Sequence, residues 1–137
     1  MTNPGQRQRP KRVLFICVEN CNRSQMAEAF ACMYGAGRVE AFSAGSRPAG
    51  RVHPKAVAAM QELGYDLTAH RSKGLAEVSD KEFDVAVTTG CGDDCPALRA
   101  KRREDWNLPC PKEMPPDQFR AVRDRIGEKV KALLAGL

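Results

Sequence analysis

The segment that decides the fold is the apolar run Val13-Leu14-Phe15-Ile16, followed by Cys17-Val18-Glu19-Asn20-Cys21-Asn22-Arg23 and by Ser24-Gln25-Met26-Ala27-Glu28-Ala29-Phe30. The first part predicts a buried β-strand, and the last part has the spacing of an amphipathic α-helix. The middle part is a tight loop between them. This order aims backbone N–H groups and a helix N-terminus at one point, which suits the binding of an anion.

Cys17 and Arg23, at the two ends of this loop, are the candidate catalytic residues. An oxyanion such as phosphate or arsenate carries about two negative charges near neutral pH and offers several acceptor oxygens. The planar guanidinium of Arg23 can donate two parallel hydrogen bonds to it. A thiol beside a helix N-terminus and a cation has a lowered pKa. We therefore expect a Cys17 thiolate that attacks the anion, with the Ser24 hydroxyl donating to that thiolate.

The residues of the loop itself are expected to bind the anion: Val18, Glu19, Asn20, Cys21, Asn22 and Arg23. Asn tolerates left-handed backbone, so Asn20 and Asn22 suit a sharp bend. The carboxylate of Glu19 is expected to point to solvent. Cys21 is expected to fill space, although a protective disulfide with Cys17 is an alternative.

The pattern along the rest of the chain predicts a single α/β domain. The 137 residues are enough for one core. Strands are expected at 12–17, 39–43, 83–88 and near 103–106, and helices at 24–34, 54–63 and 116–134. Continuous apolar strands between helices predict a four-stranded parallel sheet flanked by helices, with the site at the carboxyl ends of the strands. Residues 1–10 are polar and expected to be a disordered tail before the domain at residues 11–137.

Composition excludes several classes of partner. No apolar run reaches the length of about 18 residues that a membrane span needs, and no signal peptide is apparent, so a cytoplasmic monomer without a membrane partner is expected. The net charge of +5 suits an anionic substrate. The basic run at 99–103 lacks interleaved aromatic residues and is interpreted as solvated surface, not as a nucleic-acid site.

Cys32 is expected to lie in the core. The six cysteines are expected to be thiols, any disulfide being catalytic.

The run from Val13 to Ala31 resembles the phosphate loop of the low-molecular-weight protein tyrosine phosphatase superfamily, and its continuation at 23–29 resembles the arsenate reductase branch. The supporting matches are Phe42-Ser43-Ala44-Gly45, His70-Arg71-Ser72-Lys73, Gly90-Cys91-Gly92-Asp93-Asp94-Cys95-Pro96 and Asp105-Trp106. The resemblance covers about residues 11 to 135. It implies the fold of these phosphatases and the reduction of arsenate to arsenite, without a cofactor.

The resemblance also implies a relay of three thiols. Cys17 attacks arsenate, Cys91 then attacks Cys17 and releases arsenite, and Cys95 frees Cys17 by attacking Cys91. An external reductant such as thioredoxin would reduce the Cys91–Cys95 disulfide. Because a disulfide needs its Cα atoms within about 7 Å, we expect the segment with Gly90 and Gly92 to move.

Three alternatives stay open. Cys17, Cys21, Cys91 and Cys95 could bind zinc, but three residues separate each pair where two are commoner, so no metal is expected. A phosphatase acting on phosphate monoesters is the alternative enzyme. A redox- or metal-sensing module that keeps the anion pocket without turnover is the alternative from another class.

The sequence departs from the superfamily at two places. Cys110-Pro111 stands where these enzymes carry Asp-Pro, whose aspartate protonates the leaving group. A thiol is a poorer acid, which weakens the phosphatase interpretation. Cys110 either joins the redox relay or is a neutral change. Some arsenate reductases bind potassium through four residues; Asn20, Glu28 and Ser43 match three of them. Lys73 replaces the fourth, an aspartate, so we predict no dependence on potassium.

Overall fold

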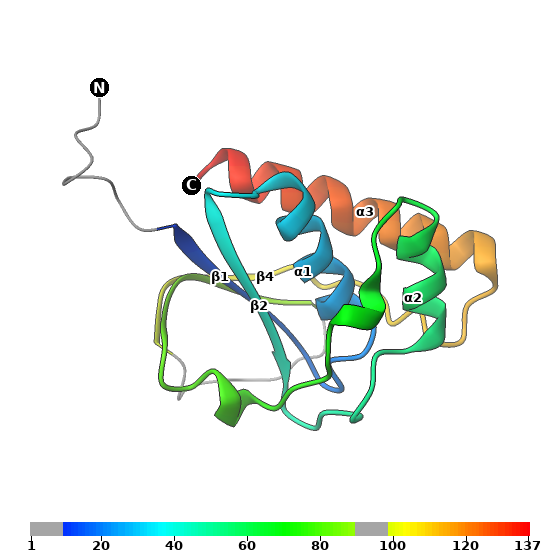
Figure 1. The fold of residues 1–137 in the computed structure, drawn as a ribbon, viewed down its shortest axis with the longest axis horizontal. Helices are drawn as coiled ribbons and strands as arrows, with labels where there is room; N and C mark the ends of the chain where they lie inside the picture. Colours follow the sequence, from blue (N-terminus) through cyan, green and yellow to red (C-terminus); the bar gives the residue numbers. More distant parts are fainter. Residues whose placement is uncertain (1–9, 90–98) are drawn as a thin grey trace.

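The computed structural model describes residues 10–89 and 99–137. Four strands form one parallel sheet, in the order β2-β1-β3-β4 (Figure 1): β1 (Lys11–Cys17), β2 (Val39–Gly45), β3 (Glu82–Thr88) and β4 (Arg99–Asp105). The predicted four-stranded parallel sheet is confirmed. The disordered tail predicted for residues 1–10 falls, except for Pro10, outside the described residues.

Three α-helices pack on one side of this sheet (Figure 1): α1 (Arg23–Tyr34), α2 (Pro54–Gln61) and α3 (Pro116–Ala135). Two short 3-10 turns, η2 (Leu67–Ala69) and η3 (Leu75–Glu77), lie between α2 and β3. The three predicted helices are therefore confirmed, with bounds that differ by at most two residues. No helix within residues 10–89 and 99–137 is long and apolar enough to cross a membrane.

Strand β1 is buried on both faces, which explains its uninterrupted apolar run. Val13 and Phe15 belong to the core beneath the helices, and neither exposes any surface. Leu14 and Ile16 point to the opposite face and pack in a second, smaller core with Val78. The segment around η3 covers this second face within the described part of the chain. Both faces are covered as predicted, but the α-helices lie on one of them.

Strand β4 corrects the predicted start of the fourth strand. The strand expected near 103–106 begins at Arg99, so the basic run at 99–103, which is solvated as predicted, is also part of an edge strand. Its side chains are largely exposed, and it joins the sheet through backbone pairing with β3. The start of the strand is not predicted because its first residues lack an apolar pattern. Charged side chains on an edge strand also discourage pairing with further strands.

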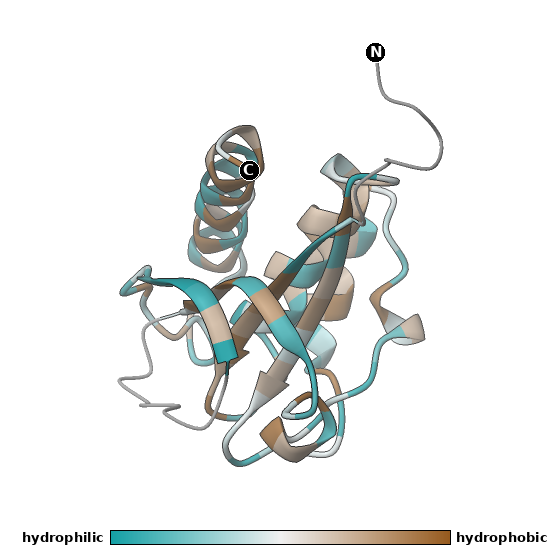
Figure 2. Cartoon of the chain, turned by 90° about the vertical axis from the view of Figure 1, so that its left-hand side faces the viewer, coloured by the Kyte–Doolittle hydropathy of each residue, from teal (hydrophilic) through white to brown (hydrophobic). Residues whose placement is uncertain are grey.

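Helix α3 covers α1 through an apolar stripe at helical spacing, and Figure 2 shows brown and teal bands on its different sides. Ile126 and Val130 are fully buried in this contact. Gly127 lies directly against the ring of Phe30, which is 2% exposed. A glycine is therefore required where these two helices cross.

We predict that Gly127→Ala lowers the free energy of unfolding by about 1 kcal/mol. A Cβ at this position would lie 2.9 Å from Phe30 Cε1. Overpacking costs about 1–3 kcal/mol, while the better helix propensity of Ala returns at most about 1 kcal/mol. Urea denaturation measures the change. Gly136→Ala is the control, because its Cβ would lie 3.6 Å from Leu133 O, an ordinary contact. Equal stability of the two variants would contradict the prediction.

Candidate active site

The loop formed by residues 18–22 joins β1 to α1 at the carboxyl end of the sheet, as predicted. Thr89, directly after β3, donates from both its backbone nitrogen and its Oγ1 to Ile16 O, each at 2.9 Å. Gly45, the last residue of β2, pairs with Cys17 in the register of the sheet. The ends of three neighbouring strands therefore hold the start of the loop.

The carbonyl groups of the loop point outward and are hydrogen-bonded there. Backbone N–H groups of the segment after β2 bind three of them: Arg47 to Val18 at 2.8 Å, Ala49 to Glu19 at 2.8 Å and His53 to Cys21 at 2.9 Å. The C=O and N–H of a trans peptide point in opposite directions. The following N–H groups of the loop therefore face its interior, where they can bind an oxyanion.

Asn20 makes this loop possible through its backbone and its side chain. Its φ of 49° lies in the left-handed region, as predicted for a sharp bend. Asn20 Nδ2 donates to Ser24 Oγ at 2.8 Å. Ser24 Oγ in turn lies 2.9 Å from Cys17 Sγ, so the contact predicted between Ser24 and Cys17 is present. Cys17 is a thiol with only 3% of its surface exposed.

Arg23 begins α1 and lies under the strand ends, with 9% of its surface exposed. Its Nη1 donates to Leu108 O at 2.8 Å and to Thr89 O at 3.2 Å. These carbonyls follow β4 and β3, so two loops fix the guanidinium next to the Cys17 loop. Arg23 and Cys17, separated by five residues in the sequence, lie at the two ends of the same loop.

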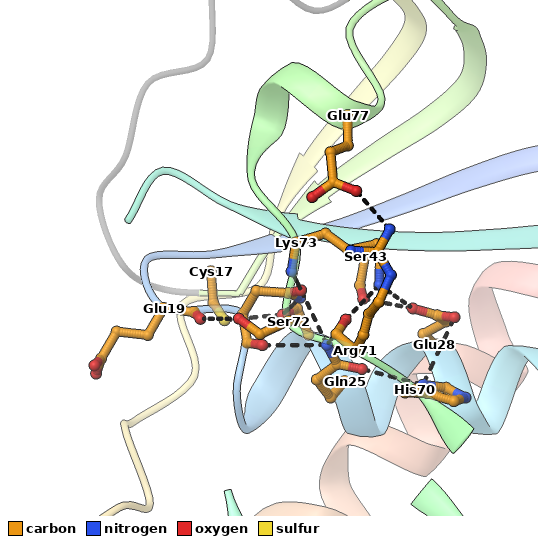
Figure 3. A network of polar contacts seen from close by, with 12 residues as sticks. Cys17, Glu19, Gln25, Glu28, Ser43, His70, Arg71, Ser72, Lys73 and Glu77 are labelled. Atoms are coloured by element: carbon orange, nitrogen blue, oxygen red, sulfur yellow. Dashed lines mark hydrogen bonds and ion pairs between the residues drawn. The ribbon is translucent and has the colours of Figure 1, made fainter. Parts of the chain in front are cut away.

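The carboxylate of Glu19 points away from the loop, as predicted (Figure 3). It forms an ion pair with Lys112 Nζ at 3.4 Å, and 44% of its side chain is exposed. Hydrogen bonding to Glu19 raises the pKa of Lys112 above its ordinary value. Lys112 therefore adds positive charge to the rim of the site.

Cys21 and Cys32 differ from each other in burial. Cys21 is 6% exposed, and burial, followed by the nearby Cys17 and Glu19, raises the pKa of its thiol to about 11. It stays protonated at neutral pH, which supports the space-filling interpretation. The prediction that Cys32 lies in the core is wrong: the last turn of α1 is exposed, and Cys32 is exposed with it.

The candidate residues Cys91 and Cys95 lie outside the described residues, so their contacts with Cys17 stay a prediction. Cys110 is exposed on the loop after β4, two residues beyond the Leu108 carbonyl that binds Arg23. Asn22 is buried in the loop with a φ of −126°, outside the left-handed region expected for it, and its Oδ1 accepts no hydrogen bond from the described residues. The described residues contain no group of three or more His, Cys, Asp or Glu side chains arranged to hold a metal.

Sequence reasoning missed a polar network behind the loop. Gln25 Nε2 donates to the backbone carbonyl and the side chain of Asn20, and its Oε1 faces His70 (Figure 3). Lys73 N donates to Asn20 Oδ1 at 2.7 Å. The motif His70-Arg71-Ser72-Lys73 was noticed only for its resemblance, because 45 residues separate His70 from Gln25 and their contact has no local signal.

The model of one family, low-molecular-weight phosphotyrosine protein phosphatase, matches residues 12–137. The chain belongs to this family. Within it, the chain is similar to proteins named arsenate reductases. It is 38% identical over 128 residues to the glutaredoxin arsenate reductase of Synechocystis sp., covering 91% of this chain and 97% of that protein.

Two solved structures of arsenate reductases are similar to this chain in fold. A structure of an arsenate reductase in the phosphate-binding state matches with a TM-score of 0.85 and 37% identity, covering 92% of this chain and 98% of that chain. The thioredoxin-dependent arsenate reductase of Corynebacterium glutamicum matches with a TM-score of 0.79 and 33% identity, covering 96% of this chain and 64% of that chain.

The potassium site that the resemblance suggests does not fit these residues. Lys73 Nζ lies 3.8 Å from Glu28 Oε1 and donates to Arg71 O at 2.8 Å. Glu28 Oε1 also accepts from Ser43 Oγ at 2.5 Å. An ammonium group of the chain thus lies among the oxygens that would bind the ion (Figure 3).

We predict that the melting temperature is equal in matched KCl and NaCl buffers for the wild type. Lys73→Asp should gain a potassium-specific increase of a few degrees, because binding to the folded state alone stabilises it. Differential scanning calorimetry measures both. A wild-type protein that melts higher in KCl than in NaCl would refute the prediction.

Gly45→Ala is predicted to weaken phosphate binding at least about tenfold, because small displacements at such sites have large effects. The added Cβ would lie 2.4 Å from Val18 O and 2.6 Å from Cys17 O, so the loop backbone must shift. Titration calorimetry with inorganic phosphate measures the affinity. Gly74→Ala is the control, since Gly74 pairs with Gly45 but its Cβ would lie 3.5 Å from Pro48 Cγ. Equal affinities for both variants would show that the loop tolerates the contact.

Proposed function

We propose that this protein reduces arsenate to arsenite, with Cys17 as the nucleophile. The observation that carries the proposal is the loop geometry: its carbonyls are bound from outside, its N–H groups face inward, and Cys17 Sγ lies 2.9 Å from Ser24 Oγ. The sequence similarity to arsenate reductases over most of the chain supports arsenate as the oxyanion. Arg23 and the loop N–H groups bind the anion and stabilise the charge that develops on its oxygens.

The first step forms a bond between Cys17 sulfur and arsenic, and a hydroxyl of arsenate leaves as water after gaining a proton. In the second step the Cys91 thiolate attacks Cys17 sulfur. A disulfide forms, the sulfur–arsenic bond breaks, and its electron pair reduces arsenic to arsenite. Cys95 then attacks Cys91, which frees Cys17 as a thiol. An external dithiol reduces the remaining Cys91–Cys95 disulfide and is itself oxidised.

The end of β3 supports this assignment of Cys91. Thr89 is bound to Ile16 O at 2.9 Å, and Ile16 directly precedes Cys17. Cys91 follows Thr89 by two residues, a length of at most about 7 Å. The chain therefore enters the segment that carries Cys91 and Cys95 beside the nucleophile. The names of the relatives allow either thioredoxin or glutaredoxin as the reductant, and we propose a thioredoxin-like dithiol because two resolving cysteines are present.

Hydrolysis of phosphate monoesters is the second candidate, and it follows from the phosphatase family alone. General acid catalysis is typically worth about 10²–10⁴-fold, and the position of the acid carries the exposed Cys110. Asp105 accepts from Thr88 Oγ1 at 3.0 Å and Asn107 N at 3.2 Å, so its carboxylate is held at β4. Weak hydrolysis is expected.

We also propose that the protein is a cytoplasmic monomer.

The test is arsenate-dependent oxidation of NADPH with thioredoxin and thioredoxin reductase. Wild-type protein should turn over continuously. Cys95→Ser should release about one arsenite per protein and then stop, because the Cys17–Cys91 disulfide cannot be resolved. Cys17→Ser should release none.

Cys32→Ser is the matched control, since Cys32 is an exposed thiol on the outer turn of α1. It should turn over like the wild type. If the wild type reduces arsenate with neither thioredoxin nor glutaredoxin but hydrolyses p-nitrophenyl phosphate, the phosphatase is the correct function. Stoichiometric zinc in the reduced protein, with neither activity, would favour the sensing module.

A further inference from the structure

A continuous series of side-chain contacts leads from Tyr65 to the nucleophile. Figure 3 shows part of it, with His70 and Gln25 adjacent behind the Cys17 loop. The contacts are Tyr65 Oη to His70 Nε2 at 2.6 Å, His70 Nδ1 to Gln25 Oε1 at 3.0 Å, Gln25 Nε2 to Asn20 Oδ1 at 2.9 Å, Asn20 Nδ2 to Ser24 Oγ at 2.8 Å and Ser24 Oγ to Cys17 Sγ at 2.9 Å. The direction of each hydrogen bond follows from backbone groups in the network, because a backbone N–H can only donate and a backbone carbonyl can only accept.

The amide of Asn20 is oriented by the backbone of Lys73. A backbone N–H can only donate, and Lys73 N lies 2.7 Å from Asn20 Oδ1. The oxygen of the amide therefore faces Lys73, and its nitrogen faces Ser24. Ser24 Oγ must accept from this nitrogen, so its own hydrogen is available for Cys17.

The amide of Gln25 is oriented by two backbone carbonyls, which can only accept. Gln25 Nε2 lies 3.0 Å from Arg71 O and 3.1 Å from Asn20 O. The other end of the amide, Oε1, then faces His70 Nδ1 and requires a donor there. The hydrogen of the imidazole is therefore on Nδ1.

The imidazole of His70 is neutral in this arrangement. Its burial lowers its pKa, while Glu28, with Oε2 3.6 Å from Nδ1, acts in the opposite direction and Lys73 lowers it further. A neutral imidazole with its hydrogen on Nδ1 has Nε2 as an acceptor. Tyr65, whose hydroxyl lies 2.6 Å from Nε2, is then the donor.

We infer that Tyr65, His70, Gln25 and Asn20 form a directed chain of hydrogen-bond donors that commits the Ser24 hydroxyl hydrogen to the sulfur of Cys17. Each group donates to the next, and successive bonds of one direction strengthen one another. His70 and Gln25 are positioning residues, because they act on Cys17 only through Asn20 and Ser24. The inference rests on the proposed role of Cys17 as a thiolate nucleophile.

The experiment measures the rate at which iodoacetamide alkylates Cys17 in the reduced full-length protein, across pH, with mass spectrometry resolving each cysteine. His70→Leu removes the donor to Gln25 and should slow alkylation of Cys17 at neutral pH by about tenfold, since hydrogen bonds to charged groups are among the stronger ones. Its pH profile should move to higher pH. His70→Asn should restore most of the rate, because its amide N–H can replace Nδ1–H.

The controls separate a directed chain from packing. Tyr65→Phe, which removes only a hydroxyl, should slow alkylation of Cys17 about two- to threefold, because the His70 donor then loses the hydrogen bond that strengthens it. Tyr34→Phe, at the other tyrosine of the chain, should have no effect. Near-ultraviolet circular dichroism verifies the fold of each variant.

Two results would overturn the inference: equal rates for wild type and His70→Leu, or equal slowing by His70→Leu and His70→Asn. If His70→Leu fails to fold, a rate for Tyr65→Phe equal to that of the wild type overturns it. The assay contains no arsenate. A protein with the predicted alkylation rates but without arsenate reduction would therefore retain the chain and lose only the proposed reaction.

Discussion

The loop after β1 must turn its peptide N–H groups toward one point, and most of the structure around it follows from that constraint. Each N–H that faces inward requires a carbonyl that faces outward, and a buried carbonyl needs a donor. The segment after β2 supplies those donors from Arg47, Ala49 and His53. The segment after β2 begins at Gly45, where it lies closest to the backbone of the Cys17 loop. A side chain at Gly45 would collide with that backbone. The anion pocket is thus built by two adjacent backbone segments, and side chains secure it.

Cys17 and Cys21 lie only four positions apart, but their surroundings give the two thiols different chemical properties. Cys17 contacts a hydroxyl that can donate to a thiolate, and it is the last residue of β1, which is hydrogen-bonded to β2 on one side and to β3 on the other. Cys21 is buried and receives only a long hydrogen bond from Asn22 Nδ2, at 3.9 Å, among the described residues, and its raised pKa keeps the proton on sulfur. Local environment decides which thiol can attack, since both have the same intrinsic chemistry.

The sequence predicted the elements whose signals are local. The apolar run of β1 and the periodic patterns of α1 and α3 are local signals, and the predicted bounds of these elements agree with the structure to within one residue. Strand β4 was misplaced because its side chains are charged and only its backbone pairs with β3. Cys32 was wrongly predicted to be buried. The periodic pattern shows which face of a helix is apolar, but it does not show whether neighbouring elements cover that face up to the last turn.

The site was predictable where one segment forms it and unpredictable where distant segments meet. Cys17, Asn20, Arg23 and Ser24 lie within eight residues of each other, so their spacing carried the interpretation. Tyr65 and His70 reach the same loop from 40 residues away or more, through contacts that only the fold creates. The contacts that we propose tune the nucleophile therefore cannot all be predicted from the motif that contains it.

One anion pocket on this fold can serve either hydrolysis or reduction, and the loops after β3 and β4 decide between them. Arg23 binds a carbonyl from each of these loops, so both begin at the pocket. Hydrolysis needs a carboxylic acid from the loop after β4, and this chain offers the exposed Cys110 there. Reduction needs thiols from the loop after β3, and this chain carries Cys91 and Cys95 there. The departure from the phosphatase pattern at Cys110 removes the acid that hydrolysis needs, whereas the residues that we propose bind the anion, which both reactions need, are all present.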